Sequence, residues 1–544
     1  APRCLRGRAA RRAGSPVVVG GRTLRDGPVS ESGLAGRRAG AVCSSFAREL
    51  AGSGISVALI ESGGFEFDAE TQALYEGEIA GVDYPLTSSR LRYFGGTTNH
   101  WGGWCRPFEP IDFEERDWVP YSGWPVTRAE LDPFYERARE VLQIRSPAFD
   151  DASAWEKGGR PLPLAGDEVE TRFFLYSPPT RMGKKYRPDI ERAKNVTCYL
   201  HSNVTEIVAS PNGAEVERLD VATLTGVRFT VKPRACVLAT GGIENARLLL
   251  LSNSVEQAGL GNRNGIVGRF FMEHPHVPSP ATFLVTGLDL VADWYRTYTK
   301  VETPAGNVVM RGCLMFTEDY LRRTKRLGTV MTFAPSHPIL AEDEPPAAGA
   351  SDEERARAEE AAKRNAVFRS VLQLARSTTA SPASSNEVGW RLGVGCASEQ
   401  EPNPASRVTL SDEKDALGLN RTKLAWRLKK SDADSLRGNL EAVARAFGGW
   451  GEGRVQILFP ERDEWTEAEG WGNHHLGTTR MAVDPRRGVV DAECRVHGIS
   501  NLFIAGSSLF PTGSTVNPTL TLVALALRLS DHLKRRFASN ASAL

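Results

Sequence analysis

The stretch "ISNLFIAGSSLFPTGSTVNPTLTLVALALRLSDHL", from Ile499 to Leu533, has the order of a buried strand, a glycine-containing turn and an amphipathic helix. Two other segments follow the same order, Gly40 to Gly64 and "RACVLATGGIENARLLLLSNS" from Arg234 to Ser254. Strands that alternate with helices in this way are typical of a parallel sheet. Because the three segments are far apart in the sequence, they predict one α/β domain assembled from discontinuous pieces.

Length and composition argue against several classes of protein. A chain of 544 residues is too long for one hydrophobic core, so at least two substructures are expected. The formal net charge of +1 gives no attraction to nucleic acid, and no apolar run approaches the ~20 residues that span a bilayer. Eight cysteines are scattered without C-x-x-C spacing, which argues against a metal site and favours reduced, cytoplasmic thiols. We therefore expect no metal ligands and no membrane span.

The chain before Gly40 is atypical. If Gly40 is the third glycine of a G-x-G-x-x-G loop, Glu61 falls ~20 residues later, where an acid binds a ribose hydroxyl. Ala35 and Arg37 then occupy the positions of the first two glycines, and the polar residues from Ser30 to Ser32 make a poor buried strand. Residues 1–39 are therefore interpreted as an atypical N-terminus. A frameshift in the gene or a misassigned start explains this segment better than evolutionary adaptation of the glycine loop does.

Two further segments have the composition of binding loops. "LRYFGGTTNHWGGWCRPFEP", from Leu91 to Pro110, offers backbone amides, small hydroxyls and flat rings, which suit a planar heterocycle. The alternative is a glycine-rich turn around a packed tryptophan. "WGNHHLGTTRM", from Trp471 to Met481, places two adjacent histidines before a Gly-Thr-Thr turn.

Asn517 stands before Pro518 at the entry to the last apolar helix. One interpretation is a helix N-cap, with one surface and one core histidine in the preceding motif. The other is that a histidine and this amide meet at one point, where the imidazole removes the proton of an alcohol as the general base.

Six motifs in this order resemble the glucose-methanol-choline (GMC) family of FAD oxidoreductases, and most of all its pyranose oxidases, glycoside oxidases and sugar dehydrogenase large subunits. The resemblance covers roughly residues 40–544 and is strongest in about the last 75. The motifs are "ALIESGG", "GGTTNHWGGWCRP", "ATGGIENARLLL", "GRFFMEHPH", "HHLGTTRM" and "NLFIAGSSLFPTGSTVNPTLT".

The resemblance implies roles for individual residues. His474 would be the general base and Asn517 its partner at the substrate oxygen, with His475 a packing neighbour and His274 a structural loop residue. Other residues would bind FAD: Glu61 at the adenosine ribose, Val204 at adenine, Gly506 at the pyrophosphate, Gly95, Gly96, Thr97, Thr98, Asn99 and His100 beneath the flavin ring, and also Gly36, Gly40, Gly241, Ser507 and Thr519. His100 matches the histidine that pyranose oxidases bond covalently to the flavin, but not every member with this His-Trp pair carries that bond.

The expected fold class is α/β, with a discontinuous Rossmann-like FAD-binding domain and a substrate domain built on an antiparallel sheet with helices. The expected boundaries are 15–110, 190–275 and 470–544 for the FAD-binding domain, and 111–189 and 276–469 for the substrate-binding domain. Within the latter, residues 341–365 read as a solvated insertion, or alternatively as a lid over the substrate.

The expected function is oxidation of a secondary alcohol of a sugar or glycoside by hydride transfer to flavin N5. Electrons would then pass to oxygen, a quinone or a redox partner protein. Two alternatives remain: an FAD-containing lyase of the same fold, and a flavin-poor or non-catalytic relative, which Arg37 suggests.

Overall fold

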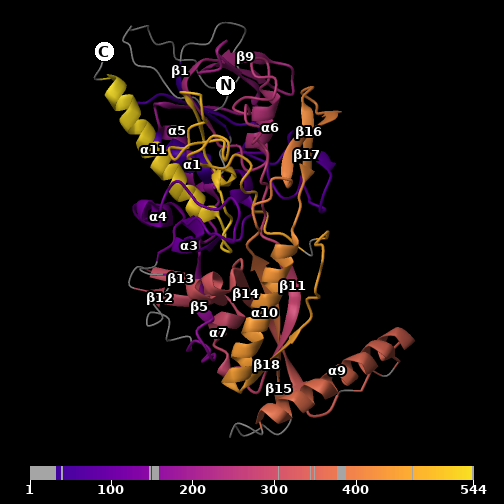
Figure 1. The fold of residues 1–544 in the computed structure, drawn as a ribbon. Helices are drawn as coiled ribbons and strands as arrows, with labels where there is room; N and C mark the ends of the chain where they lie inside the picture. Colours follow the sequence, from indigo (N-terminus) through magenta and orange to yellow (C-terminus); the bar gives the residue numbers. More distant parts are fainter. Residues whose placement is uncertain are drawn as a thin grey trace.

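The computed structural model describes residues 32–37, 41–145, 149, 159–303, 306–343, 345–347, 349–376, 387–467 and 470–541. Figure 1 shows an elongated body in two parts, one built around a parallel sheet and the other around an antiparallel sheet. Helix α9 (Asp352–Arg376) projects from the end of the second part. No helix in these ranges combines the length and apolarity that crossing a bilayer requires.

The parallel sheet has five strands in the order β19-β10-β1-β2-β6, and each neighbouring pair is parallel. Its strands are β1 (Ser32–Arg37), β2 (Val57–Ile60), β6 (Val196–Tyr199), β10 (Pro233–Leu238) and β19 (Leu502–Ile504). All residues of β2 and β19 are buried, which is typical of a parallel sheet covered on both faces. The sheet is therefore assembled from distant parts of the chain.

A strand precedes the first helix. Ser32, which the sequence analysis counted among the residues of a poor buried strand, begins β1 (Ser32–Arg37), and β1 lies between β10 and β2. Gly36 and Arg37 pair with Leu59 and Ile60, so Gly36 lies in the strand and not in the expected glycine loop. Pairing on both sides satisfies the backbone of β1, which side-chain polarity could not reveal. Residues 1–31 and 38–40, which include Gly40, lie outside the described residues.

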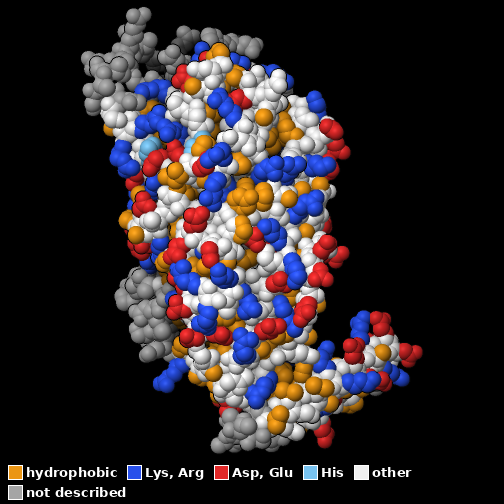
Figure 2. Space-filling model, in the orientation of Figure 1, with side chains coloured by type: hydrophobic (Ala, Val, Ile, Leu, Met, Phe, Trp, Pro, Cys, Tyr) orange, Lys and Arg blue, Asp and Glu red, His pale blue; other side chains and the backbone are white. Residues whose placement is uncertain are grey.

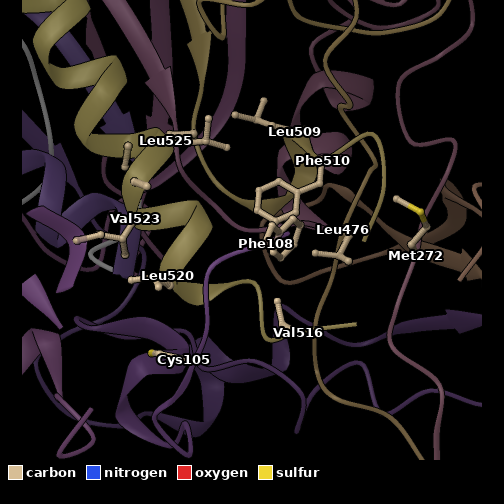
Figure 3. Close-up of a cluster of buried hydrophobic side chains, with 14 of the residues drawn as sticks. Cys105, Phe108, Met272, Leu476, Leu509, Phe510, Val516, Leu520, Val523 and Leu525 are labelled. Atoms are coloured by element: carbon tan, nitrogen blue, oxygen red, sulfur yellow. The ribbon is translucent and has the colours of Figure 1, made fainter. Parts of the chain in front are cut away.

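Helices cover this sheet. They are α1 (Ala41–Leu50), α4 (Arg128–Val141), α5 (Met182–Arg192), α6 (Glu244–Leu251) and α11 (Thr519–Ala541). Helix α11 packs against α1 and α4. Figure 3 shows its Leu520 and Val523 in a buried apolar cluster with Phe108 and Phe510, whose rings meet edge to face at 5.4 Å. This core fixes the loop before α11, which carries Asn517.

The antiparallel sheet has the order β18-β11-β15-β14-β13-β5-β4, with β12 paired to β13. Its strands are β4 (Trp104–Cys105), β5 (Val169–Tyr176), β11 (His276–Val285), β12 (Thr299–Thr303), β13 (Gly306–Phe316), β14 (Thr329–Leu340), β15 (Glu387–Ser398) and β18 (Gly453–Ile457). Helix α10 (Lys430–Trp450) lies along it in Figure 1, with its apolar side buried. Two short helices, α7 (Asp293–Arg296) and α8 (Glu318–Thr324), complete this part.

The described residues also form two small three-stranded sheets and several short helices. The sheets are β16 (Arg407–Lys414), β17 (Asn420–Ala425) and β3 (Gly77–Ile79), and β7 (Asn203–Ala209), β8 (Val216–Ala222) and β9 (Arg228–Val231). The short helices are α2 (Ala69–Ala73), α3 (Pro110–Phe113), η1 (Gly96–Asn99), η3 (Leu288–Leu290) and η4 (Ser507–Leu509).

Helix α9 agrees with the expected solvated insertion. Its first turns are exposed and mostly charged, and Figure 2 shows it projecting from the body. It contacts β11, β14, β15 and β18 and contributes no residue to the cavity described below. On the face drawn in Figure 2, basic and acidic side chains are interspersed.

Candidate active site

A cavity lies at the carboxyl edge of the parallel sheet. The carboxyl ends of parallel strands meet at one edge, which is where α/β proteins bind ligands. The turns after β10 and β19 are joined there by a hydrogen bond from the Ala505 N–H to the Leu238 carbonyl, at 2.7 Å. The cavity brings together eight of the residues selected from the sequence: Gly96, Thr97, Thr98, Gly241, His474, Gly506, Ser507 and Thr519.

One wall of the cavity is bare backbone. Gly241 has φ +88°, and a Cβ added there would meet no atom within 4 Å. Gly506 also has a positive φ, of 124°. At the next residue, Gly242, an added Cβ would lie 2.3 Å from the His475 carbonyl oxygen, so the turn packs directly on the histidine segment. A flat group could approach the main chain closely at this wall.

The glycine loop before Trp101 forms another wall. Gly95 has φ +98°, and its added Cβ would lie 2.7 Å from the Asn99 amide oxygen. The Asn99 amide donates to the Phe94 carbonyl at 3.0 Å, and the Thr98 hydroxyl donates to the Gly95 carbonyl at 2.6 Å. Gly95 and Asn99 therefore shape the loop, while Thr97 and Thr98 line the cavity.

His474 is held between a histidine and an amide. Its Nδ1 lies 2.8 Å from the Nδ1 of His274, and its Nε2 lies 3.1 Å from the Nδ2 of Asn517. Helix α11 begins at Thr519, so Asn517 lies outside the N-cap position, and the capping interpretation is wrong. Burial, with the neighbouring histidines as a second cause, lowers the pKa of His474 well below its usual value. His474 is therefore a neutral imidazole near pH 7.

A buried carboxylate lies beneath this pair. Glu273 Oε1 accepts the backbone N–H groups of His274 and His474, each at 2.8 Å, and its Oε2 accepts the Tyr84 hydroxyl at 2.6 Å. Burial raises the pKa of Glu273 to about 7. The Tyr84 oxygen also lies 2.8 Å from His475 Nε2, and burial lowers the pKa of His475 to about 3.

Sequence reasoning missed three members of this arrangement: Glu273, Tyr84 and the contact of His274 with His474. His274 was expected to be a structural loop residue, but its ring bonds directly to the candidate base. The available signal was the "MEHPH" run, in which an acid and two histidines follow the apolar residues Phe270 to Met272.

The remaining predicted residues lie around the cavity. Glu61 and Val204 are buried at the end of β2 and in β7, and Glu61 Oε1 accepts the Gly63 N–H at 2.9 Å. His100 ends the η1 turn with an exposed side chain. Their roles at a cofactor stay predictions.

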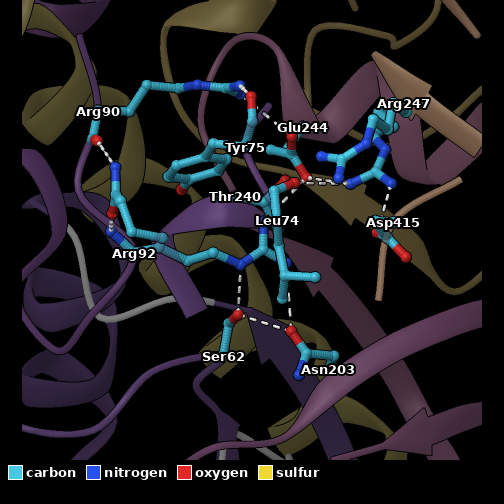
Figure 4. A network of polar contacts seen from close by, with 12 residues as sticks. Ser62, Leu74, Tyr75, Arg90, Arg92, Asn203, Thr240, Glu244, Arg247 and Asp415 are labelled. Carbon is cyan, nitrogen blue, oxygen red and sulfur yellow. Dashed lines mark hydrogen bonds and ion pairs between the residues drawn. The ribbon is translucent and has the colours of Figure 1, made fainter. Parts of the chain in front are cut away.

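A buried arginine network adjoins the end of β2. Figure 4 shows Arg92 between Ser62, which accepts from its Nε at 2.6 Å, and Glu244, at 3.5 Å. Glu244 also pairs with Arg90, whose guanidinium lies 4.0 Å from the centre of the Tyr75 ring. This network ties β2 to α6 and holds Arg90 and Tyr75 at the cavity wall.

The chain is similar to known flavoenzyme families. A family model described as GMC oxidoreductase matches residues 402–526. The 2-methyl-1,2-propanediol dehydrogenase of Mycolicibacterium austroafricanum is 23% identical, over 87% of this chain and 87% of that protein. The fructose dehydrogenase large subunit of Gluconobacter japonicus is 25% identical, over 81% of this chain and 80% of that protein. A solved formate oxidase matches with a TM-score of 0.52 at 15% identity, over 92% and 97% of the two chains, which supports the mixed α/β fold class predicted above.

Proposed function

This chain carries the carboxyl-terminal domain of the GMC oxidoreductases and belongs to that family, and on this premise we propose that it oxidises a secondary alcohol of a sugar or glycoside with FAD. The observation that carries the proposal is the meeting of His474 Nε2 and the Asn517 amide beside a cavity with a bare glycine wall.

The residues present fit FAD. The open space at the Gly241 Cβ position suits a flat ring system pressed against the backbone, and Thr97 and Ser507 offer hydroxyls from other walls of the cavity. In this proposal Gly506 lies at the pyrophosphate, while Glu61 and Val204 hold the adenosine. The segments 15–110, 190–275 and 470–544 then form a Rossmann-like FAD-binding domain, and 111–189 and 276–469 form the substrate domain. When bound, the flavin supplies the hydride acceptor at N5.

His474 would act on the substrate hydroxyl. Because its pKa is lowered, the imidazole is neutral and can take the hydroxyl proton at Nε2 as the hydride leaves the carbon. The Asn517 amide, 3.1 Å from Nε2, would orient the same oxygen. The diol named in one relative carries a primary and a tertiary alcohol, whereas the sugar named in the other carries secondary alcohols. We commit to the sugar class because it agrees with the motif pattern.

Anaerobic bleaching of the flavin tests this function. The purified holoenzyme is mixed with monosaccharides, aryl glycosides, aminoglycosides and, as the competing class, 2-methyl-1,2-propanediol, which has no secondary alcohol. Faster bleaching by a sugar or glycoside supports the proposal. Bleaching by the diol alone would contradict the substrate class, and an unchanged spectrum with every compound would favour a lyase or a non-catalytic relative. Reoxidation by air or by a quinone then identifies the acceptor.

A further inference from the structure

The candidate base and three groups near it form one continuous chain of hydrogen bonds. The chain runs from the Asn517 amide to His474 Nε2 at 3.1 Å, and from His474 Nδ1 to His274 Nδ1 at 2.8 Å. It ends where His274 Nε2 lies 3.0 Å from the carbonyl oxygen of Gly513. His274 and His474 are both buried enough that their rings are neutral near pH 7. A neutral imidazole has one donor and one acceptor, so each link constrains the next.

The Gly513 end of the chain fixes the proton positions. A carbonyl oxygen can only accept, so His274 must carry its hydrogen on Nε2. Its Nδ1 is then an acceptor, and the 2.8 Å contact requires that His474 donate from Nδ1. His474 Nε2 is left with an unprotonated lone pair.

The Asn517 end is consistent with this assignment. The Asn517 amide nitrogen faces His474 Nε2 and donates to it, so Nε2 is an acceptor. In the opposite tautomer of His474, two acceptors would face each other at His274.

We propose that His274 is a positioning residue that holds His474 in the tautomer with its proton on Nδ1, so that Nε2 is the atom that accepts the substrate proton. This deepens the proposed function and rests on it for its kinetic consequence. Because Nε2 has one lone pair, the Asn517 N–H that it accepts in the free enzyme gives way to the substrate hydroxyl. As the substrate O–H bond breaks, the N–H bond forms at His474 Nε2, and the imidazolium keeps its Nδ1–H bond to His274. A hydrogen bond from a charged donor is stronger than one from a neutral donor, so His274 also stabilises the protonated base.

Glu273 holds the backbones of His274 and His474 so that their Nδ1 atoms lie 2.8 Å apart. One carboxylate oxygen accepts the backbone N–H of both histidines, which are 200 residues apart in sequence. The other titratable groups around the pair are His276, His475 and Glu399, and Glu399 favours a proton on His274 while the histidines oppose one on His474. None of them offers a second acceptor to His474 Nδ1 among the described hydrogen bonds.

The tautomer can be measured without substrate. Long-range ¹H–¹⁵N spectra of the holoenzyme labelled on its nine histidines distinguish protonated from bare ring nitrogens, and His474→Gln assigns the signals of His474. We expect Nδ1 protonated and Nε2 bare in the wild type and in His274→Asn, whose amide oxygen can replace the acceptor. His274→Phe, which fills the same space without an acceptor, should lose this preference. A proton on Nε2 in the wild type, or an unchanged tautomer in His274→Phe, would overturn the proposal.

Flavin reduction supplies the second measurement. His274→Phe should slow reduction by a bleaching sugar by ~10²–10⁴-fold, the range that general acid–base catalysis contributes. His274→Asn should recover most of the rate. His276→Phe is the matched control, because its ring lies 6.4 Å from that of His474 without a hydrogen bond to it in the described structure. Equal rates in the wild type and His274→Phe would overturn the positioning role. A wild type that no sugar bleaches contradicts the proposed function, and the spectra then still decide the tautomer.

Discussion

Both carboxylate oxygens of Glu273 lie within hydrogen-bond distance of the His474 backbone N–H, at 2.8 and 2.9 Å. One of them also accepts the backbone N–H of His274. A single buried acid thus joins the loop before β11 to the segment that carries the candidate base. The fold around the site depends on this acceptor, since a buried N–H without a partner is costly.

Glu273→Ala should therefore destabilise the protein. The N–H groups of His274 and His474 and the Tyr84 hydroxyl would lose their acceptor, and each buried unsatisfied group costs about 1–3 kcal/mol. Thermal unfolding of the holoenzyme measures the loss. Glu273→Gln keeps an amide oxygen and should lose less, while Glu359→Ala on the exposed side of α9 is the matched control. Equal melting temperatures for Glu273→Ala and the control would contradict the role of Glu273.

Gly241→Ala should lower the FAD content. The substitution adds strain of about 1–2 kcal/mol at a positive φ and also puts a methyl group into the cavity wall. Gly418→Ala is the matched control, because Gly418 has φ +77° and equally open space but lies in an exposed turn between β16 and β17. Both variants should lose similar stability, whereas flavin per chain, measured by absorbance, should fall in Gly241→Ala. Full flavin in both would show that this wall does not contact the cofactor.

The rate of flavin reduction should be flat above about pH 6.5. The pKa of His474 is lowered, so the active, unprotonated base is already fully populated there and is lost only as the pH falls further. Stopped-flow reduction between pH 4.5 and 9 at saturating substrate measures this profile. Glu273, whose pKa is about 7, also titrates near the base, so Glu273→Gln is measured beside the wild type. A rate that climbs through pH 7 to 8 in both proteins would mean that the base has a raised pKa, contrary to its burial among histidines.

We expect any covalent bond between the protein and the flavin to form at His100. Its side chain is exposed at the end of η1, next to Thr98 and Trp101, whose carbonyls both accept from Arg181. If the bond forms, acid precipitation should leave a yellow pellet in the wild type and a colourless one in His100→Ala. His337→Ala, at an exposed position of β14, is the control. Yellow supernatant from the wild type would show that the flavin is not covalently bound.

Much of the cavity could be predicted from sequence because it depends on local patterns. Gly241 and Gly506 each follow a buried strand, and parallel strands place their carboxyl ends at one edge. The strand-turn-helix order alone is therefore enough to predict that these two glycines lie at the carboxyl edge of the sheet.

The support of the base could not be predicted in this way. The contacts of Glu273 and His274 with His474 join residues about 200 positions apart, and no local pattern encodes them. The start of β1 was undervalued for a different reason. The polar residues from Ser30 to Ser32 were judged by their side chains, whereas the backbone of β1, which begins at Ser32, pairs with strands on both sides.

The most direct test of the central claim is single-turnover flavin reduction in His474→Ala and His475→Ala with the same bleaching sugar. His474 faces Asn517, whereas His475 bonds to Tyr84, so the two adjacent histidines should behave differently. We predict that His474→Ala keeps its flavin but is reduced ~10²–10⁴-fold more slowly, the usual loss for a general base, while His475→Ala is affected far less. Equal rates in the wild type and His474→Ala, or a larger loss in His475→Ala, would contradict the assignment of His474 as the base.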